Sequence, residues 1–141
     1  MAKAKTAAKK KYIIWVEDEW GLIDLYKSMI KTMKGVELEI ITLGTLALQK
    51  IKDIEAGKAD KPDLVMLDLL LPDGINGDKI LEVMRQTPST KDIPVYILTN
   101  YGGEGMEDEL TKNLKAEKYM IKTEWMPKRL VPFLKKKLGL K

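Results

Sequence analysis

Short apolar segments alternate with amphipathic segments from residue 12 to the end of the chain. Five of the apolar segments are predicted strands: residues 12–16, 36–42, 63–68, 93–98 and 118–121. The third is a continuous apolar run, which is typical of a parallel strand covered by helices on both faces. Segments with apolar residues at three- and four-residue spacing follow each strand, and they predict five helices. Strict alternation of strands and helices favours an α/β fold with a doubly wound parallel sheet.

The predicted helices differ in how clearly their ends are marked. Gly57 is a suitable stop for the second helix, the third ends before Pro88, and the fifth starts near Pro127, a residue tolerated at a first helical position. A Pro-Asp-Gly-Ile-Asn-Gly loop at 72–77 precedes the third helix, and a glycine-rich connector at 102–105 precedes the fourth.

Polar residues stand where four of the predicted strands end. Glu17 and Asp18 close the first strand, Asp68 the third, Thr99 the fourth and Lys122 the fifth. Ligands of open α/β sheets bind beyond the carboxyl ends of the strands, so neighbouring parallel strands would bring these five side chains together.

The composition restricts the chemistry of such a site. The chain has 141 residues, enough for one domain, and it contains neither cysteine nor histidine. Disulfides, thiolate chemistry, a histidine base and the usual zinc ligands are therefore excluded. We expect no membrane partner, because no apolar stretch approaches the roughly 20 residues that a membrane span needs.

Positive charge is concentrated at the two ends of the chain, whose net charge is +4. We expect residues 1–10 to be a lysine-rich disordered tail and 139–141 to be a C-terminal tail. Contact of the lysines with nucleic acid or an anionic surface is the alternative. The chain has only Arg85 and Arg129 as arginines, which argues against a specific nucleic-acid partner.

Three converging carboxylates repel one another unless a cation joins them. Oxygen ligands without histidine or cysteine select Mg²⁺, with Mn²⁺ as the second choice. The chain contains neither of the common glycine-rich phosphate-binding motifs. A carboxylate that itself takes up a phosphoryl group fits better, with Lys122 neutralising the phosphoryl oxygens and Thr99 donating a hydrogen bond.

These residues, in this order, resemble the receiver domain of two-component response regulators. The resemblance covers residues 11–138 and is carried by Glu17-Asp18 in IIWVEDE, Asp68 in LVMLDLLLP, Thr99 in VYILTN and Lys122 in YMIK. It implies a flavodoxin-like receiver fold, with a five-stranded parallel sheet of order 2-1-3-4-5 and five helices.

The resemblance also implies residue roles. Asp68 would be the phosphoacceptor that takes its phosphoryl group from a histidine kinase or a histidine phosphotransfer protein. Asp18, Asp68 and the backbone carbonyl of Leu70 would bind Mg²⁺ directly, and Glu17 would bind it through water. The metal would be the only cofactor.

Three further residues have roles in catalysis and switching by the same resemblance. Lys122 would pair with the phosphoryl group, and Thr99 would move toward it on activation. Tyr119 falls at the aromatic switch position and would turn inward as Thr99 moves.

The chain departs from the family pattern at three places. Thr123 follows Lys122 where the family usually has a proline after a cis peptide bond, and the loop before Gly77 is one residue longer than usual. Leu70 and Tyr101 occupy positions that tune dephosphorylation, and neither side chain readily holds an attacking water. The sequence therefore predicts a long-lived phosphoryl-aspartate.

The leading interpretation is a stand-alone, cytoplasmic response regulator of phosphorelay signal transduction, and not an enzyme beyond its own phosphotransfer and dephosphorylation. We expect its output to be a protein–protein contact with an unknown downstream partner, through the fourth helix, fifth strand and fifth helix. It would be a monomer or a phosphorylation-dependent dimer. The alternatives are a pseudo-receiver that binds partners without phosphorylation, and a Mg²⁺-dependent aspartyl-phosphate phosphatase, for which Leu70 stands where a second acid is usual.

Overall fold

The computed structural model describes residues 9–103 and 105–140. Most of the expected lysine-rich tail, which ends at residue 10, lies outside the described residues. The described residues form a five-stranded parallel sheet of order β2-β1-β3-β4-β5, which confirms the predicted fold class. The strands are β1 (Lys11–Val16), β2 (Val36–Ile41), β3 (Leu64–Leu67), β4 (Val95–Thr99) and β5 (Lys118–Ile121).

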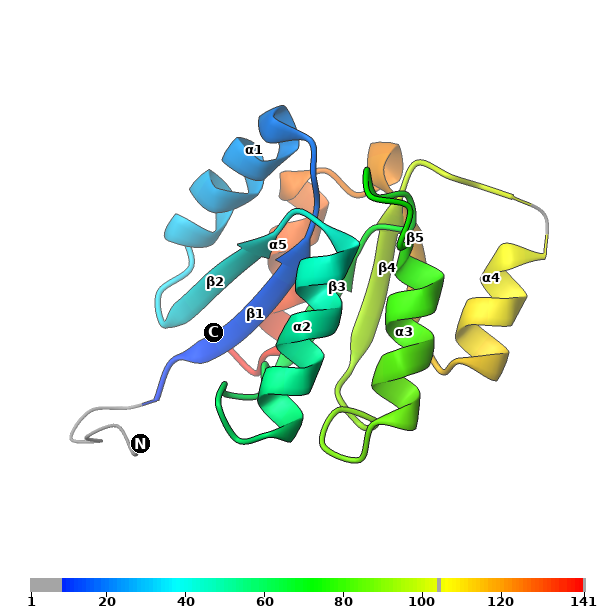
Figure 1. Ribbon diagram of the computed structural model, residues 1–141. Helices are drawn as coiled ribbons and strands as arrows, with labels where there is room; N and C mark the ends of the chain where they lie inside the picture. The colour runs from blue at the N-terminus through cyan, green and yellow to red at the C-terminus, as the bar shows by residue number, and fades with distance from the viewer. Residues whose placement is uncertain (1–8, 104, 141) are drawn as a thin grey trace.

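Helices cover both faces of the sheet (Figure 1). Their bounds are α1 (Trp20–Lys31), α2 (Gly44–Glu55), α3 (Gly77–Gln86), α4 (Met106–Asp108) and α5 (Pro127–Lys137). None of the helices in the described part of the chain is long and apolar enough to span a bilayer.

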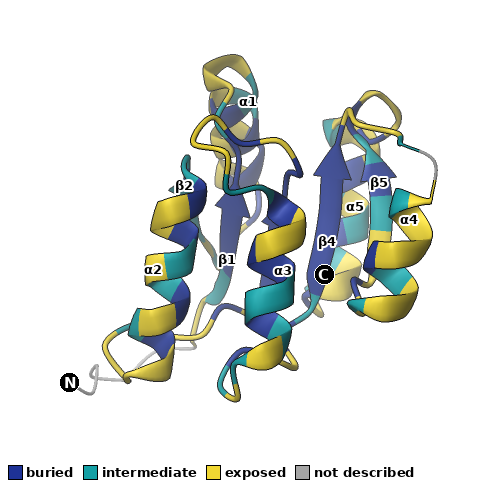
Figure 2. Ribbon diagram, turned by 45° about the vertical axis from the view of Figure 1, so that its right-hand side comes forward, coloured by how far each residue is buried: buried dark blue, intermediate teal, exposed yellow. Residues whose placement is uncertain are grey.

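Alternation along the strands divides the core into two layers. Ile14 and Val16 of β1 pack with the apolar residues of α2 and α3, whereas Ile13 and Trp15 pack with those of α1 and α5. Trp15 stacks on Tyr26 of α1, with ring centroids 4.3 Å apart. In Figure 2 most of the central strands are buried, whereas the long helices carry both buried and exposed residues. This two-sided burial explains why β3 is a continuous apolar run.

The fourth helix differs from a regular α-helix. Its α-helical part is only Met106–Asp108, and a π-helical turn, Glu109–Asn113, continues it. The wider turn places Leu110 in the core beside α3, where it is fully buried. The expected apolar face of this helix is therefore present, but sequence spacing did not reveal the π-turn.

The chain after β5 also differs from the usual family geometry. None of the described peptide bonds is cis, so Lys122–Thr123 is trans. A 3₁₀ turn, Lys122–Glu124, follows β5 directly, and the Trp125 N–H donates to the Lys122 carbonyl at 3.2 Å. Lys122 is thereby held at the end of its strand without the proline.

Arg85, at the end of α3, joins three segments through its guanidinium. Nη1 donates to the carbonyls of Lys91 and Ile93, both at 3.0 Å. Nε donates to Leu114 at 2.9 Å and Nη2 to Lys115 at 3.1 Å. The guanidinium thus binds both the approach to β4 and the turn before β5.

We predict that Arg85→Ala lowers the free energy of unfolding by about 2 kcal/mol, because four carbonyls lose a charged donor. Arg85→Lys should recover only part of this loss, since an ammonium cannot reproduce the planar fork. Urea unfolding of both variants measures the effect, with the exposed Lys79→Ala as control. Equal stability of the lysine variant and the wild type would contradict the predicted role of the fork.

Candidate functional site

The predicted site residues lie together at the carboxyl ends of β1, β3, β4 and β5. Register places Val16 of β1 beside Leu67 of β3, so the residues that follow them are also neighbours. The Asp68 N–H donates to the Val16 carbonyl at 3.1 Å, which extends the pairing by one step. The Glu17 N–H donates to Ile41 of β2 at 3.0 Å, so both acids have fixed backbones.

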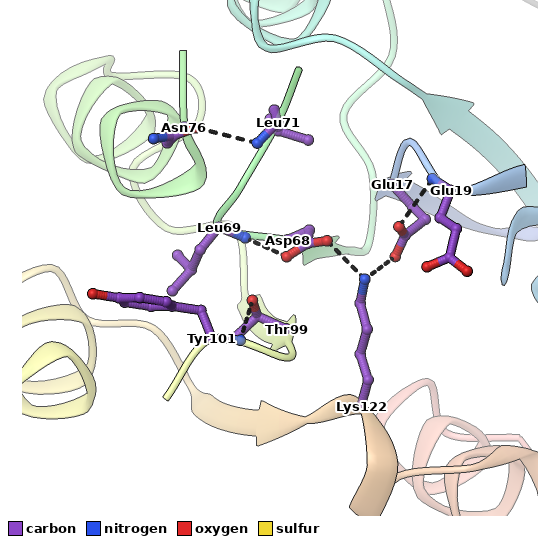
Figure 3. A network of polar contacts seen from close by, with 9 residues as sticks. All are labelled: Glu17, Glu19, Asp68, Leu69, Leu71, Asn76, Thr99, Tyr101 and Lys122. Atoms are coloured by element: carbon purple, nitrogen blue, oxygen red, sulfur yellow. Dashed lines mark hydrogen bonds and ion pairs between the residues drawn. The ribbon is translucent and has the colours of Figure 1, made fainter. Parts of the chain in front are cut away.

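An ammonium group joins the two acids. Lys122 Nζ lies 2.7 Å from Asp68 Oδ2 and 2.7 Å from Glu17 Oε1 (Figure 3). All three side chains are buried, with exposed fractions of 1% for Glu17, 6% for Asp68 and 8% for Lys122. Each ion depends on the others, because an isolated buried charge is strongly destabilising.

Two backbone amides donate hydrogen bonds to the buried carboxylates. The Leu69 N–H donates to Asp68 Oδ1 at 2.7 Å, and the Glu19 N–H donates to Glu17 Oε2 at 3.2 Å. Glu17 Oε1 has its ion pair with Lys122 but no hydrogen bond of regular geometry among the described residues. Glu17 is therefore the least satisfied of the three buried charges Glu17, Asp68 and Lys122.

Burial shapes the ionisation of this group. It raises the pKa of Glu17, and the nearby Lys122 offsets only part of that rise. For Lys122, burial favours the neutral amine, but the hydrogen bonds and charges of Asp68 and Glu17 outweigh it and raise the pKa of Lys122. The lysine is thus held in its charged form.

The acidic residues fit a divalent cation. Glu17, Asp18 and Asp68 each offer a carboxylate oxygen, and these oxygens all lie within 4.8 Å of one another. They border an open pocket of about 330 Å³ that Leu70 and Lys122 also line. Three carboxylates exceed the single ammonium by two negative charges, and oxygen ligands of this kind suit Mg²⁺ or Mn²⁺.

Thr99 lies at the site but keeps a local contact. It is buried at the end of β4, and its Oγ1 accepts a hydrogen bond from the Tyr101 N–H at 3.1 Å. No described residue accepts the hydroxyl proton of Thr99. The hydroxyl therefore remains able to donate toward the pocket that it lines.

Tyr119 is connected to the same loop. Its half-buried ring packs against the α2–α3 side of the core, and its hydroxyl donates to the Tyr101 carbonyl. Thr99 and Tyr119, which were predicted separately, are thus both hydrogen-bonded to the backbone of Tyr101. Sequence reasoning singled out Tyr101 only for dephosphorylation, and nothing in the sequence pattern indicates that its backbone connects the other two.

The loop after Asp68 is fixed by contacts that the sequence did not predict. Asp73 accepts hydrogen bonds from the Gly44 N–H at 3.0 Å and the Thr45 N–H at 2.8 Å, at the first turn of α2. Gly77 packs so closely that an added Cβ would lie 2.2 Å from the Asp68 carbonyl oxygen. The Pro-Asp-Gly sequence marked a loop, but the distant partner of Asp73 could not be read from it. Leu70, in this loop, lies at the pocket with 56% of its surface exposed.

A family model for the response regulator receiver domain matches residues 13–134. The chain belongs to this family. The predicted resemblance is thereby confirmed, and with it the general class of the protein: receiver domains are signalling modules of two-component systems that accept phosphoryl groups from histidine kinases.

Curated relatives are larger than this chain. The phosphate regulon transcriptional regulatory protein PhoB of Pseudomonas aeruginosa is 32% identical over 128 residues, which cover 89% of this chain and 50% of PhoB. The chain spans about half the length of several curated relatives that it matches, some of which are named as DNA-binding regulators.

Solved receiver structures superpose along most of the chain. The Mn²⁺-bound response regulator Rcp1 is 28% identical, with a TM-score of 0.79 and coverage of 91% of this chain and 94% of Rcp1. The phosphorylated cyanobacterial phytochrome response regulator RcpA is 25% identical, with a TM-score of 0.77 and coverage of 89% and 92%. Both neighbours support the fold, and the first shows that a similar receiver binds a divalent cation.

We predict that Asp18→Asn weakens binding of Mg²⁺ or Mn²⁺ by about tenfold or more, because it removes one of the three converging charges. Calorimetric titration of each cation measures the effect. Asp24→Asn, on the exposed face of α1, removes the same charge outside the acidic cluster and should leave the affinity unchanged. If the two variants bind the cation with equal affinity, Asp18 is not a ligand of the metal.

Proposed function

We propose that the protein is a phosphorylatable receiver whose Asp68 takes a phosphoryl group from a partner phosphohistidine in a Mg²⁺-dependent reaction. The observation that supports it best is the buried ammonium of Lys122, 2.7 Å from both Asp68 and Glu17, beside a third carboxylate. A fold that needed only a stable core would not gather three acids around one buried lysine, since desolvating them is costly.

The chemistry follows from the positions of the side chains. An Asp68 carboxylate oxygen bonds to phosphorus as the phosphorus–nitrogen bond of the donor breaks. The donor imidazole leaves with the bonding electrons and takes a proton from water. Asp18, Asp68, the Leu70 carbonyl and, through water, Glu17 would hold Mg²⁺, which would supply positive charge to neutralise the phosphoryl oxygens.

Lys122 and Thr99 act on the transferred group. The ammonium, charged and already beside Asp68, pairs with a phosphoryl oxygen once the carboxylate charge is esterified. The Thr99 hydroxyl donates to another phosphoryl oxygen. This movement of Thr99 would alter its hydrogen bond with the Tyr101 N–H and, through the Tyr101 backbone, the hydrogen bond of the Tyr119 hydroxyl. We propose Thr99 and Tyr119 as the switch, and residues 11–138 as the receiver domain that contains it.

The proposed function extends to the cellular location, the oligomeric state and the output of the protein. The protein would act in the cytoplasm as a monomer or a phosphorylation-dependent dimer, and its output would be contact with a downstream protein. The prediction that nucleic acid is not a partner still rests on the scarcity of arginine. DNA binding by the longer relatives is a property of those proteins.

We expect incubation with acetyl phosphate and Mg²⁺ to add the mass of one phosphoryl group to the wild-type protein, as intact-mass spectrometry would detect. Asp68→Asn should gain none, because an amide is not the nucleophile that a carboxylate is. Asp63→Asn, which keeps the site acids, serves as control. Absence of added mass on wild type, with Mg²⁺ and beryllofluoride leaving Thr99 amide shifts unchanged, would favour the pseudo-receiver. Multiple turnover of a small phosphoester would favour the phosphatase.

The phosphoryl group on Asp68 should hydrolyse slowly, with a half-life of minutes or longer. The exposed side chains of Leu70 and Tyr101 lie at the pocket and offer no carboxylate or amide to hold an attacking water. We predict that Leu70→Asn shortens the half-life severalfold, whereas Leu46→Asn, at another exposed leucine, leaves it unchanged. A wild-type half-life of seconds would be incompatible with this explanation.

A further inference from the structure

β2 is an edge strand whose outer side is open. It pairs only with β1 among the described strands (Figure 1). The Gly35 carbonyl accepts from the Lys11 N–H at 2.8 Å, and the Ile41 carbonyl accepts from the Glu17 N–H at 3.0 Å. Because alternate residues of a strand face alternate sides, Val36, Leu38 and Ile40 direct their N–H and C=O groups away from β1.

The same three residues line a groove. It has a volume of about 730 Å³ and lies between β2 and the C-terminal half of α1, where Ile30 and Met33 complete its apolar lining. The side chains of Val36, Leu38 and Ile40 are only half-buried, although they pack against the α1 side of the core. Unused backbone groups and apolar surface therefore occur together along one strand.

Lysines surround this groove. Lys10, Lys27, Lys31 and Lys34 all line it, and none of them forms an ion pair within residues 9–103 and 105–140. The only acid among the lining residues is Glu39. Its carboxylate is already bound by the Tyr12 hydroxyl and by Lys50 Nζ at 2.9 Å. The groove thus has an excess of positive charge with no internal partner.

We propose that this groove, the β2-edge groove, binds an extended acidic segment of a partner protein, which adds to the sheet as a strand beside β2. Strand addition supplies main-chain hydrogen bonds, and the apolar lining and lysines select alternating apolar and acidic side chains. A second copy of the chain is a disfavoured occupant, because its groove lysines would lie against those of the first copy and repel them. Nucleic acid is disfavoured because the groove has neither arginine nor an aromatic ring for stacking.

The test uses the full-length protein and a fluorescein-labelled synthetic peptide of about eight residues in which glutamate and valine alternate. We expect saturable binding that weakens with added salt. Amide hydrogen exchange at Val36, Leu38 and Ile40 should slow on binding. A peptide with lysine in place of glutamate, and one with alternate backbone nitrogens methylated, should bind at least about tenfold more weakly.

Matched variants distinguish binding in the groove from a general effect of the protein's net charge. Lys27→Glu combined with Lys31→Glu should weaken binding about tenfold, because it reverses the groove's charge. Lys58→Glu combined with Lys91→Glu makes the same change in net charge on exposed lysines outside the groove and should leave binding unchanged. Asp68→Asn should bind as wild type, since the groove does not depend on the phosphorylation site.

Several outcomes would overturn the proposal. One is no saturable peptide binding up to about 1 mM. Another is equal binding by the two charge-reversal variants. If the groove variant instead forms dimers while binding no peptide, the lysines serve only to protect an edge strand from self-association. Tighter binding of a single-stranded oligonucleotide, with perturbation of the same amides, would assign the groove to nucleic acid.

Discussion

The contact between the Lys122 ammonium and the carboxylates of Glu17 and Asp68 is the constraint on which the site depends. It joins the ends of β1, β3 and β5. Because β4 lies between β3 and β5, the Lys122 side chain reaches across the end of β4. Removing Lys122 would leave two buried carboxylates without their counterion, which costs several kcal/mol. The strand order, the register of β1 with β3 and the 3₁₀ turn after Lys122 all serve to keep these three groups together.

The charge balance of the site affects both its stability and its attraction for a cation. One ammonium compensates part of the charge of three acids, so the resting site still attracts a cation. Burial raises the pKa of Glu17, and burial alone would lower the pKa of Lys122, which its two acidic partners raise instead. Esterification of Asp68 would replace one carboxylate by a phosphoryl group with more charge and more acceptor oxygens. Lys122 contacts Asp68 and Thr99 lines the same pocket, so both are placed to respond.

Sequence predicted the sheet and the five polar residues because both depend on local pattern. Apolar segments marked the strands, and a polar residue after four of them marked the carboxyl end. The contacts that sequence missed join residues far apart in the chain. Asp73 binds the first turn of α2, and Tyr119 binds the backbone of Tyr101. The π-turn at Glu109–Asn113 was missed because helical spacing alone does not distinguish it from an α-turn.

The Asp68 site and the β2-edge groove occupy different parts of the sheet. Glu17 and Asp68 follow the carboxyl ends of β1 and β3, whereas the groove runs along the edge strand β2, from Val36 to Ile40. Helix α1 spans both, since Trp20 follows the acidic turn and Lys31 lines the groove. The groove and the pocket at Asp68 share no lining residue, so a segment bound beside β2 would leave Asp68 accessible. Coupling between the two would run through α1 or through the hydrogen bond from the Glu17 N–H to the Ile41 carbonyl of β2.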